Sequence, residues 1–395
     1  FIMSEINASN FKKEHGDLAP DLVGVTELTS PYFFVPPSGT TAERPEDCEP
    51  GTLRFNTDIG SLEVFRGKTI GWEQIQRVEN QYLGGGTGSN TGTGTRGLIA
   101  GGYTGSTRST ATDFITLTTM GNGQDFGDLV TGASSKGATG SRVRSLMAAG
   151  YFVDNTLKDE IEFNTYASLG NGTDFGNLLE ANEAPTGVSN GTRGIFMAGG
   201  NPSPTGGNRI QYVSIANEGN AVDFGDTTFN WYAGAGFQST VRGVAGGGQT
   251  PGSPYNTNSM DFITMSSTGN ASDFGDLTTS GHYAAGGASN ATRGIIAGGR
   301  TNPATYNNVI EFFTIATTGN GIDFGDLTLG RWEIHGGMAS ATRIVLQGGN
   351  ASSPNDYINI LEKVEIATTG NAIDFGDMSF QARGSVSCSN GHGGL

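Results

Sequence analysis

One short phrase occurs six times along this chain, and its spacing constrains the fold more than any other feature. The phrase is Asp-Phe-Gly-Asp with small variations, and its phenylalanines lie 49 to 51 residues apart: Phe126, Phe175, Phe224, Phe274, Phe324 and Phe375. A second phrase, Arg-Gly-apolar-apolar-Ala-Gly-Gly with variations, keeps the same period. A period of about 40–50 residues built from short strand-forming segments is typical of radial β-repeats rather than of helical solenoids.

A single repeat contains four segments of strand type. In the fifth repeat these are residues 292–299, 309–316, 322–327 and 335–340. They are rich in β-branched and aromatic residues or in small ones, and Gly and Asn mark the tight turn between the second and third. Apolar residues occupy both parities of the strands, which predicts sheets that are covered on both faces.

The fourth segment of each repeat consists mainly of small residues. These segments are 137–141, 187–190, 234–236, 284–289, 336–340 and 385–389. Because small residues suit places where backbones crowd, we expect these strands to be innermost. The chain starts its first repeat at the second strand and ends on an inner strand. We therefore expect the last strand to complete the first sheet, which would close a ring and remove an open sheet edge.

The repeat resembles the Kelch repeat. In that family a diglycine ends the second strand of each blade and an aromatic pair follows, and Gly298-Gly299, Phe312 and Phe324 match those roles. Asp-Phe-Gly-Asp stands where Kelch repeats typically have a Trp. The resemblance covers residues 92–395 and implies an all-β fold, a six-bladed Kelch-like β-propeller closed by the C-terminal strand.

Residues 1–91 form a separate region with a different composition. Segments 51–57 and 62–67 predict a β-hairpin that turns at residues 57–60, and Trp72 begins a third strand. Residues 84–95 are rich in Gly, Thr and Ser and are typical of a linker. Together with the Pro-Ser-Gly-Thr-Thr segment at 37–41, the hairpin resembles a small module of tailed-phage structural proteins. Phe55 and Phe65 stand where Tyr is common in that module.

The propeller repeats are also similar to those of marine-phage, especially cyanophage, virion proteins. The two resemblances imply a structural virion protein of a tailed phage: a fibre, spike or decoration component assembled in the host cytoplasm. Residues 1–91 would attach the chain to other virion proteins, and the propeller would bind a host-surface glycan or a virion protein. Virion symmetry favours a homo-oligomer on the particle, in which several weak contacts act together.

The loops after the diglycines carry the candidate binding residues. They are Tyr103, Tyr151, Tyr255, Asn256, Tyr306, Asn307 and Tyr357. Tyr and Asn among Ser and Gly form a composition suited to recognition, and loops on a rigid scaffold commonly bind ligands. The alternative is that exposed loops simply contain such residues.

Two charged residues keep fixed places in the repeat. The second phrase opens with Arg96, Arg144, Arg193, Arg242, Arg293 or Arg343, and the first phrase opens with Asp125, Asp174, Asp223, Asp273, Asp323 or Asp374. We hypothesise a repeated, bidentate Arg–Asp bridge. Alternatively, the aspartates accept N–H bonds of the neighbouring turn. Calcium at these loops is a further alternative, although each repeat offers few of the six or more oxygens that calcium takes.

The composition argues against several other functions. The chain carries 22 Lys and Arg against 38 Asp and Glu, without a basic run, so nucleic-acid binding is not expected. No apolar run reaches the ~18–20 residues of a membrane span, so membrane insertion is not expected. Cys48 and Cys388 are far apart and form no metal-binding motif, which leaves a disulfide between them as an alternative.

We expect no catalytic residue, no cofactor and no metal, and hence no enzyme. The histidines favour packing near the inner strands, with an axial metal as the alternative. Two other functions remain open. A glycan depolymerase would need a pocket with paired acidic residues, and a cellular Kelch-type adaptor would lack the phage-like segment 33–75.

Overall fold

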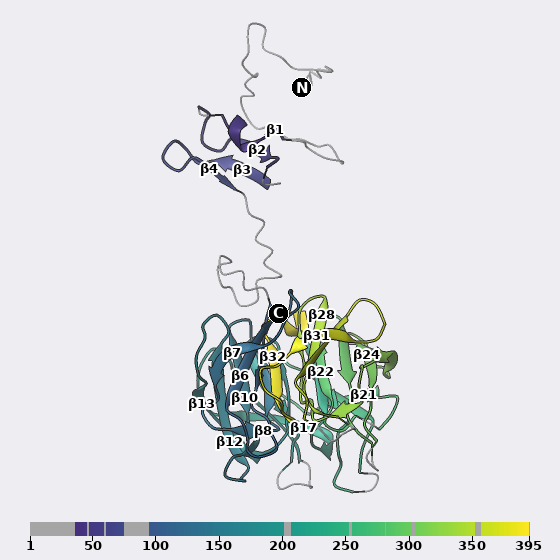
Figure 1. The fold of residues 1–395 in the computed structure, drawn as a ribbon. Helices are drawn as coiled ribbons and strands as arrows, with labels where there is room; N and C mark the ends of the chain where they lie inside the picture. Colours follow the sequence, from purple (N-terminus) through teal and green to yellow (C-terminus); the bar gives the residue numbers. More distant parts are fainter. Residues whose placement is uncertain are drawn as a thin grey trace, which may run out of the picture. The chain divides into compact units, whose positions relative to one another are not determined.

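The computed structural model describes residues 36–45, 47–58, 61–74, 95–200, 207–252, 255–280, 282–301, 305–351 and 357–394. The protein is all-β: the described residues form strands and two 3-10 turns, η1 (Thr41–Glu43) and η3 (His392–Gly394), and no α-helix. The chain divides into two compact units, Phe1–Arg77 and Val78–Leu395 (Figure 1). The predicted domain boundary at 91/92 and nearly all of the predicted linker 84–95 lie outside the described residues.

The first unit contains a four-stranded sheet in the order β1 (Ser38–Gly39), β2 (Leu53–Asn56), β3 (Ser61–Phe65) and β4 (Trp72–Gln74). β2, β3 and β4 are antiparallel neighbours, so the predicted hairpin and third strand are confirmed, and β1 adds to β2 in parallel. Phe65 is buried against Trp72, with 5.5 Å between the ring centroids. The buried Glu63 pairs with Arg44 and accepts a hydrogen bond from Asn56 Nδ2 at 2.9 Å, which satisfies a charge inside this small sheet.

The second unit is built from six four-stranded antiparallel sheets, numbered here 1 to 6 in chain order. Sheet 1 has the order β32 (Val386–Ser389), β5 (Arg96–Ala100), β6 (Ala111–Thr116) and β7 (Gln124–Asp128). Sheet 2 contains β9 (Gly137–Gly140), β10 (Arg144–Ala148), β12 (Lys158–Thr165) and β13 (Thr173–Asn182). Sheet 3 contains β14 (Thr186–Ser189), β15 (Arg193–Met197), β16 (Gly207–Ser214) and β17 (Val222–Trp231).

The remaining sheets repeat this order. Sheet 4 contains β18 (Ala235–Gln238), β19 (Arg242–Gly246), β20 (Ser259–Thr264) and β21 (Ser272–Asp276). Sheet 5 contains β22 (Gly286–Ser289), β23 (Arg293–Ala297), β24 (Val309–Thr314) and β25 (Ile322–Asp326). Sheet 6 contains β27 (Met338–Ala339), β28 (Arg343–Gln347), β30 (Ile360–Glu365) and β31 (Ile373–Asp377). Two short pairs join β8 (Ala133–Ser134) to β11 (Tyr151–Phe152), and β26 (Arg331–Trp332) to β29 (Asn350–Ala351).

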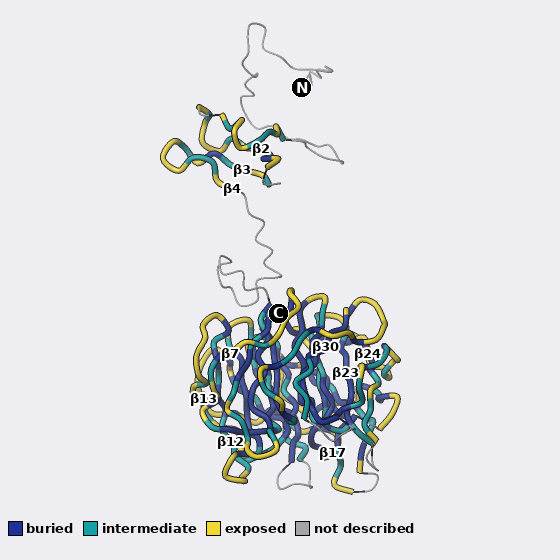
Figure 2. Tube along the Cα trace, in the orientation of Figure 1, coloured by how far each residue is buried: buried dark blue, intermediate teal, exposed yellow. Residues whose placement is uncertain are grey.

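The first strands of the six sheets contact one another in a closed cycle. β9 contacts β14, and the contacts continue through β18, β22, β27 and β32 back to β9. These are the segments of small residues predicted to be innermost. A side chain would not fit at their crossings, since a Cβ on Gly187 would lie 2.2 Å from the Ala138 oxygen. Figure 2 shows the buried residues concentrated in the interior of this unit.

The C-terminal strand completes sheet 1, as predicted. β32 pairs antiparallel with β5, with Cys388 opposite Leu98. The backbone N–H of Arg96 donates to Asn390 Oδ1 at 2.8 Å. In sheet 5 the equivalent bond, from Arg293 N–H to Asn290 Oδ1, joins residues only three apart and also measures 2.8 Å. Asn390 therefore supplies to sheet 1 the hydrogen-bond acceptor that a residue three positions away supplies in sheet 5.

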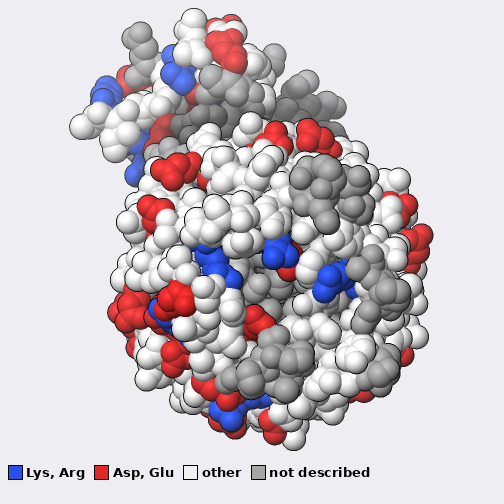
Figure 3. Space-filling model, turned by 60° about the horizontal axis from the view of Figure 1, so that its bottom comes forward, with Lys and Arg blue, Asp and Glu red and all other residues white. Residues whose placement is uncertain are grey.

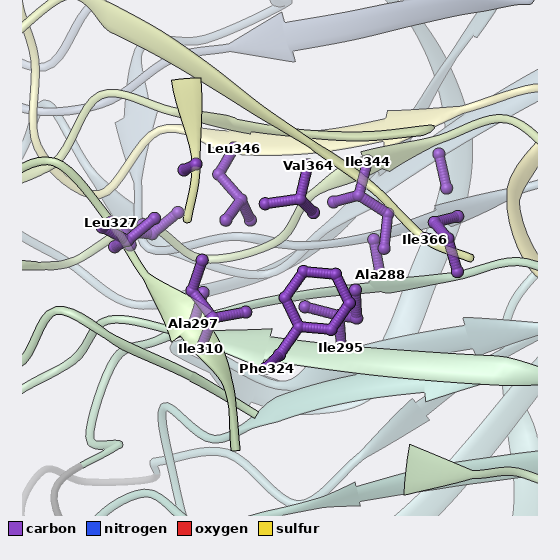
Figure 4. Close-up of a cluster of buried hydrophobic side chains, with 13 residues drawn as sticks. Ala288, Ile295, Ala297, Ile310, Phe324, Leu327, Ile344, Leu346, Val364 and Ile366 are labelled. Carbon is purple, nitrogen blue, oxygen red and sulfur yellow. The ribbon is translucent and has the colours of Figure 1, made fainter. Parts of the chain in front are cut away.

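Adjacent sheets are held together by apolar clusters between their faces. In the cluster between sheets 5 and 6, Phe324 is 2 % exposed and packs among residues such as Ile295 and Ile344 (Figure 4). Its ring also meets Phe312 edge-on at 6.2 Å. Burying a side chain of this size contributes roughly 1.5–3 kcal/mol. The phenylalanine of the repeated phrase is buried in all six sheets.

The glycine of the repeated phrase allows the next sheet to approach. Gly370 N–H donates to the Phe324 oxygen at 2.7 Å, so the turn of sheet 6 is hydrogen-bonded to the outer strand of sheet 5. Gly325 has φ +147, and a Cβ there would lie 2.5 Å from the carbonyl of Gly370. The same bond joins Gly121 N–H of sheet 1 to the Phe375 oxygen of sheet 6 at 3.0 Å. The first and last sheets are therefore linked at their outer strands as well.

The predicted Arg–Asp bridge is not found. Among the described residues, none of the six repeat arginines pairs with a repeat aspartate, and all six aspartates are exposed on the outer strands. Arg293 Nη1 instead donates to the Ile366 carbonyl of the next sheet at 2.8 Å, with its guanidinium 4.4 Å from the centroid of the Phe312 ring. Equivalent bonds join Arg96 to Tyr166, Arg144 to Ile215, Arg193 to Met265, Arg242 to Ile315 and Arg343 to Leu117.

A second repeated contact between adjacent sheets, made by a buried polar side chain, was not predicted. The residue before each third-strand aromatic position is acidic or Gln and is buried: Asp113, Glu162, Gln211, Asp261, Glu311 and Glu362. Glu311 accepts hydrogen bonds from the N–H and hydroxyl of Thr278 at 2.9 and 2.6 Å, across to the segment that follows sheet 4. Asp113 does the same for Ser379, at 2.6 and 2.7 Å, and so joins sheet 1 to sheet 6. An acidic residue in an otherwise apolar strand was the available sequence signal.

Candidate ligand-binding face

One end of the six sheets collects the diglycines and the loops that follow them. The second strand of each sheet ends at its diglycine position, so these loops lie at the same end as the short segments that precede the innermost strands. We call this end the diglycine-loop face. Figure 3 shows it obliquely, with Lys and Arg atoms gathered near its middle.

A ring of backbone hydrogen bonds lies at the centre of this face. Ala184 N–H donates to the Ser135 oxygen at 2.7 Å, Ala233 to Ala184 at 3.1 Å, and Ala284 to Ala233 at 2.8 Å. The ring closes through three further bonds: Ile334 to Ala284, Gly384 to Glu333 and Ser135 to Gly384, at 3.1, 2.9 and 2.8 Å. One segment from each of the six sheets takes part. We call this closed set the backbone ring.

The backbone ring requires an unusual backbone conformation. Ser135, Ala184, Ala233, Ala284 and Glu333 have φ between +50 and +56, and Gly384 has φ +66. For residues other than glycine this left-handed region costs of order 1 kcal/mol each, and the surrounding structure must hold it. Because Ala, Ser and Glu do not signal such a conformation, the sequence did not predict the ring. It provides a rigid base for the side chains around it.

A pocket of about 520 Å³ opens beside the backbone ring. Its lining residues are Tyr103, Arg108, Ser134, Ser135, Tyr151, Asn155, Glu183, Glu333 and Arg383. They come from the loops of sheets 1 and 2 and from the segments before the innermost strands. The pocket therefore combines aromatic rings with cationic, acidic and neutral polar groups.

Arginines and aromatic rings alternate from this pocket along the face. The Arg108 guanidinium lies 4.1 Å from the Tyr151 ring centroid and 5.6 Å from that of Tyr103. Arg383 lies 5.3 Å from Tyr103 and 5.4 Å from Tyr357. Further along, Arg300 lies 3.7 Å from the Trp332 ring and 5.1 Å from Tyr283. We call these residues, Tyr151, Arg108, Tyr103, Tyr357, Arg383, Trp332, Arg300 and Tyr283, the arginine–aromatic arc.

Glu333 is the most perturbed carboxyl group of the face. Burial raises its pKa from 4.5 to about 7, and the nearby Glu183 acts in the same direction, whereas Arg383 and Arg300 oppose the shift. Arg383 Nε lies 3.3 Å from Glu333 Oε2. The Arg383 pair therefore offsets only part of the cost of burying this carboxylate. Arg108 has a neutral partner, since its Nη1 donates to Asn155 Oδ1 at 3.0 Å.

The structure brings together four of the seven predicted binding residues. Tyr103 and Tyr151 line the pocket, Tyr357 meets Tyr103 edge-on at 5.8 Å, and Tyr306 packs 6.2 Å from Trp332.

The other three predicted residues make hydrogen bonds that hold the loops. Tyr255 is half exposed, and its carbonyl accepts the N–H of Thr250. Asn256 is buried and its Nδ2 donates to the Arg300 oxygen at 3.0 Å, while Asn307 Oδ1 accepts the N–H of Val309 at 3.0 Å.

Sequence reasoning missed the three arginines, Glu333, Trp332 and Tyr283. A signal for some of them was present. Tyr232, Tyr283, Trp332 and Arg383 occupy equivalent places in successive repeats, one residue before the backbone ring, and bulky residues directly before a strand of small residues are conspicuous. Their neighbours across the face come from other repeats, and only the fold brings them together.

A second, smaller cavity lies between the innermost strands and measures about 50 Å³. All six sheets contribute to its lining, which includes His335, His392, Gln238 and Cys388. Burial lowers the pKa of both histidines to about 4, so they are neutral at pH 7. A space of this size holds water rather than an organic ligand. No group of His, Cys, Asp or Glu side chains suited to a metal ion occurs in the described part of the chain.

Cys48 and Cys388 are both free thiols, so the alternative of a disulfide between them is not found. None of the helical segments in the described ranges is long and apolar enough to cross a membrane. No protein-family model matches this chain, and no curated protein matches it significantly.

Proposed function

We propose that the second unit is a six-bladed, Kelch-like β-propeller and that the chain is a structural virion protein of a tailed phage. Three links between the first and last repeats support a closed propeller: the cycle of innermost strands, the pairing of β32 with β5, and the bond from Gly121 to Phe375. A radial array of four-stranded antiparallel sheets is the propeller arrangement.

The proposed activity is binding through the diglycine-loop face, to a host-surface glycan or to another virion protein. The observation that carries this proposal is the pocket of about 520 Å³ set beside the backbone ring. Its lining projects from loops and short segments, while the hydrogen-bonded ring beneath repeats in every sheet. Side chains on a rigid base form a preorganised binding site, which lowers the entropy lost on binding.

The assignment to a virion is supported by the resemblance of residues 33–75 and of the repeats to phage proteins. The position of Thr95 is consistent with it. Thr95 precedes β5 at the end opposite to its diglycine, Gly101-Gly102, so the chain joins the propeller away from the binding face. Several copies on one particle would convert weak contacts into firm attachment.

One observation favours a second candidate, a glycan-cleaving enzyme. Glu183 and Glu333 both line the pocket, and the raised pKa of Glu333 is the property of a general acid. Glycan binding and glycan cleavage are distinguished by incubating the protein with host polysaccharide and measuring new reducing ends. A binding protein releases none. Release that is lost in Glu333→Gln would establish the enzyme instead.

The virion proposal is tested on purified phage particles. Antibodies raised against residues 300–308 should label intact particles in electron micrographs, and the isolated chain should compete with the phage for adsorption to host cells. Absence of the chain from purified particles would refute the virion assignment. A chain that is present on particles but does not compete would refute host binding and leave another virion protein as the partner.

A further inference from the structure

We propose that the pocket and the arginine–aromatic arc bind an anionic saccharide, a sugar chain that carries carboxylates or sulfate esters. The proposal rests on the binding function proposed above and names its ligand class.

The first argument is the local charge. The chain as a whole has a net charge of −16, yet Arg108, Arg300 and Arg383 lie together on the diglycine-loop face. Neither Arg108 nor Arg300 forms an ion pair with a carboxylate of the described residues. The Arg108 side chain contacts aromatic rings and the neutral Asn155, and Arg300 packs on Trp332 while its charge acts on the pKa of the nearby Glu333. Cations held by rings keep their full positive charge, so Arg108 and Arg300 attract anions even though the carboxyl groups of Glu183 and Glu333 also line the pocket.

The second argument is the geometry of a guanidinium packed on a ring. The ring occupies the flat face of the guanidinium, whereas hydrogen bonds leave from its edges. Arg108 stacks at 4.1 Å from the Tyr151 centroid and uses Nη1 for Asn155 Oδ1. Its remaining donors have the planar fork that matches a carboxylate or a sulfate. Stacking thus holds the Arg108 guanidinium in place without using its hydrogen-bond donors.

The third argument is the extent of the arc. Tyr151 belongs to the loop of sheet 2, Tyr103 and Arg108 to that of sheet 1, Tyr357 to that of sheet 6, and Arg300 to that of sheet 5. The cations lie on sheet 5 (Arg300) and on sheet 1 (Arg108 and Arg383), and the aromatic rings Trp332 and Tyr357 of sheet 6 lie between Arg300 and Arg383. A polymer with one anion per sugar unit matches a row of cations, and the sugar rings can pack on the aromatic side chains. A single small anion would use only one position of the arc.

Glu333 supports the assignment. Its carboxylate is the partner of Arg383, at 3.3 Å, and its pKa of about 7 means that it takes up a proton near neutrality. The groups that act on it are Arg383, Arg300 and Glu183. Once Glu333 is protonated, Arg383 is released to the ligand. Binding of an anion should therefore be accompanied by proton uptake and should tighten as the pH falls from about 8 to about 6.

The test uses the full chain and three oligosaccharides of equal length: a uronic acid oligomer, the same oligomer after reduction of its carboxylates, and a sulfated neutral oligomer. Calorimetric titration should give at least about tenfold tighter binding for one or both anionic oligomers than for the reduced one, because charge-assisted hydrogen bonds are gained. Comparing the affinities for the uronic acid oligomer and the sulfated oligomer distinguishes recognition of carboxylates from recognition of sulfates. Equal affinity for the reduced oligomer would overturn the proposal.

Variants locate the site. Arg108→Gln and Arg300→Gln should each weaken binding by about tenfold or more. Arg142→Gln is the matched control, because Arg142 is exposed at the opposite end of the sheets and its loss changes the net charge equally. Equal weakening in the control would mean a nonspecific charge effect and would refute the site, as would unchanged binding in both face variants with unchanged circular dichroism. If the chain binds host cells but neither anionic oligomer, only the ligand class fails; if it binds neither host cells nor virion proteins, the proposed function fails.

Discussion

The substitution Glu333→Gln provides a quantitative test of how the binding face is built. Burial raises the pKa of Glu333 from 4.5 to about 7. Between these two pH values the folded protein keeps a proton that the unfolded chain has lost, so stability falls as the pH rises through this window. A displacement of this size corresponds to about 3 kcal/mol. Below about pH 4.5 the contribution of Glu333 no longer changes with pH.

The variant lacks this proton equilibrium. Relative to the wild type, Glu333→Gln should therefore gain about 3 kcal/mol between pH 4.5 and pH 8, whatever constant cost the lost contact with Arg383 adds at all pH values. Urea unfolding followed by tryptophan fluorescence over this range measures the difference. Glu160→Gln is the control, because Glu160 is 39 % exposed and the substitution removes the same charge. A difference between Glu333→Gln and the wild type that stays constant with pH would show that Glu333 is not held in the environment described here.

Three further predictions concern the closure and packing of the six sheets. Asn390→Ala should lower the free energy of unfolding by about 1 kcal/mol, because the Arg96 N–H loses its acceptor. Thermal unfolding should show a larger loss for Asn290→Ala, because the Asn290 side chain also bonds Thr292 and Ala341, and a loss for Asn290→Ala with none for Asn390→Ala would mean that the Asn390 side chain does not hold sheet 1. Gly325→Ala should cost about 1–3 kcal/mol, whereas Gly319→Ala, where a Cβ meets no atom within 4 Å, should cost clearly less; equal costs would contradict the close approach. In a Cys48→Ser chain, Cys388, whose pKa burial raises to about 12, should resist thiol reagents at pH 8 until the protein unfolds. Rapid labelling of Cys388 in the folded form of this variant would contradict its burial.

The strand arrangement could be predicted because the residue types in each repeat favour particular strands and turns. Gly and Asn at the turns, β-branched residues in the strands and small residues in the innermost segments all agree with one another, and the last segment has the composition of an innermost strand with no sheet of its own. The partner of Arg293 could not be predicted in this way. It donates to the Ile366 carbonyl of the neighbouring sheet, and every residue has such a carbonyl, so the sequence carries no specific signal for it.

The candidate site was predictable only in part for a related reason. Tyr103, Tyr151 and Tyr357 were noticed for their type, and the structure does place them together. The three arginines of the arginine–aromatic arc, Arg108, Arg300 and Arg383, belong to three different repeats. Their proximity depends on the angle at which successive sheets meet, which no local pattern encodes. The left-handed conformation of Glu333 is likewise imposed by the hydrogen-bonded ring rather than by the residue itself.

The pairing of β32 with β5 has a consequence for biosynthesis. During synthesis β5 emerges from the ribosome well before β32, its neighbour on one side. Until β32 has been made, the first repeat therefore exposes an unpaired backbone edge that can capture a strand from another nascent chain. A product truncated by a premature stop codon keeps this edge permanently. Only a chain that includes β32 can therefore complete sheet 1.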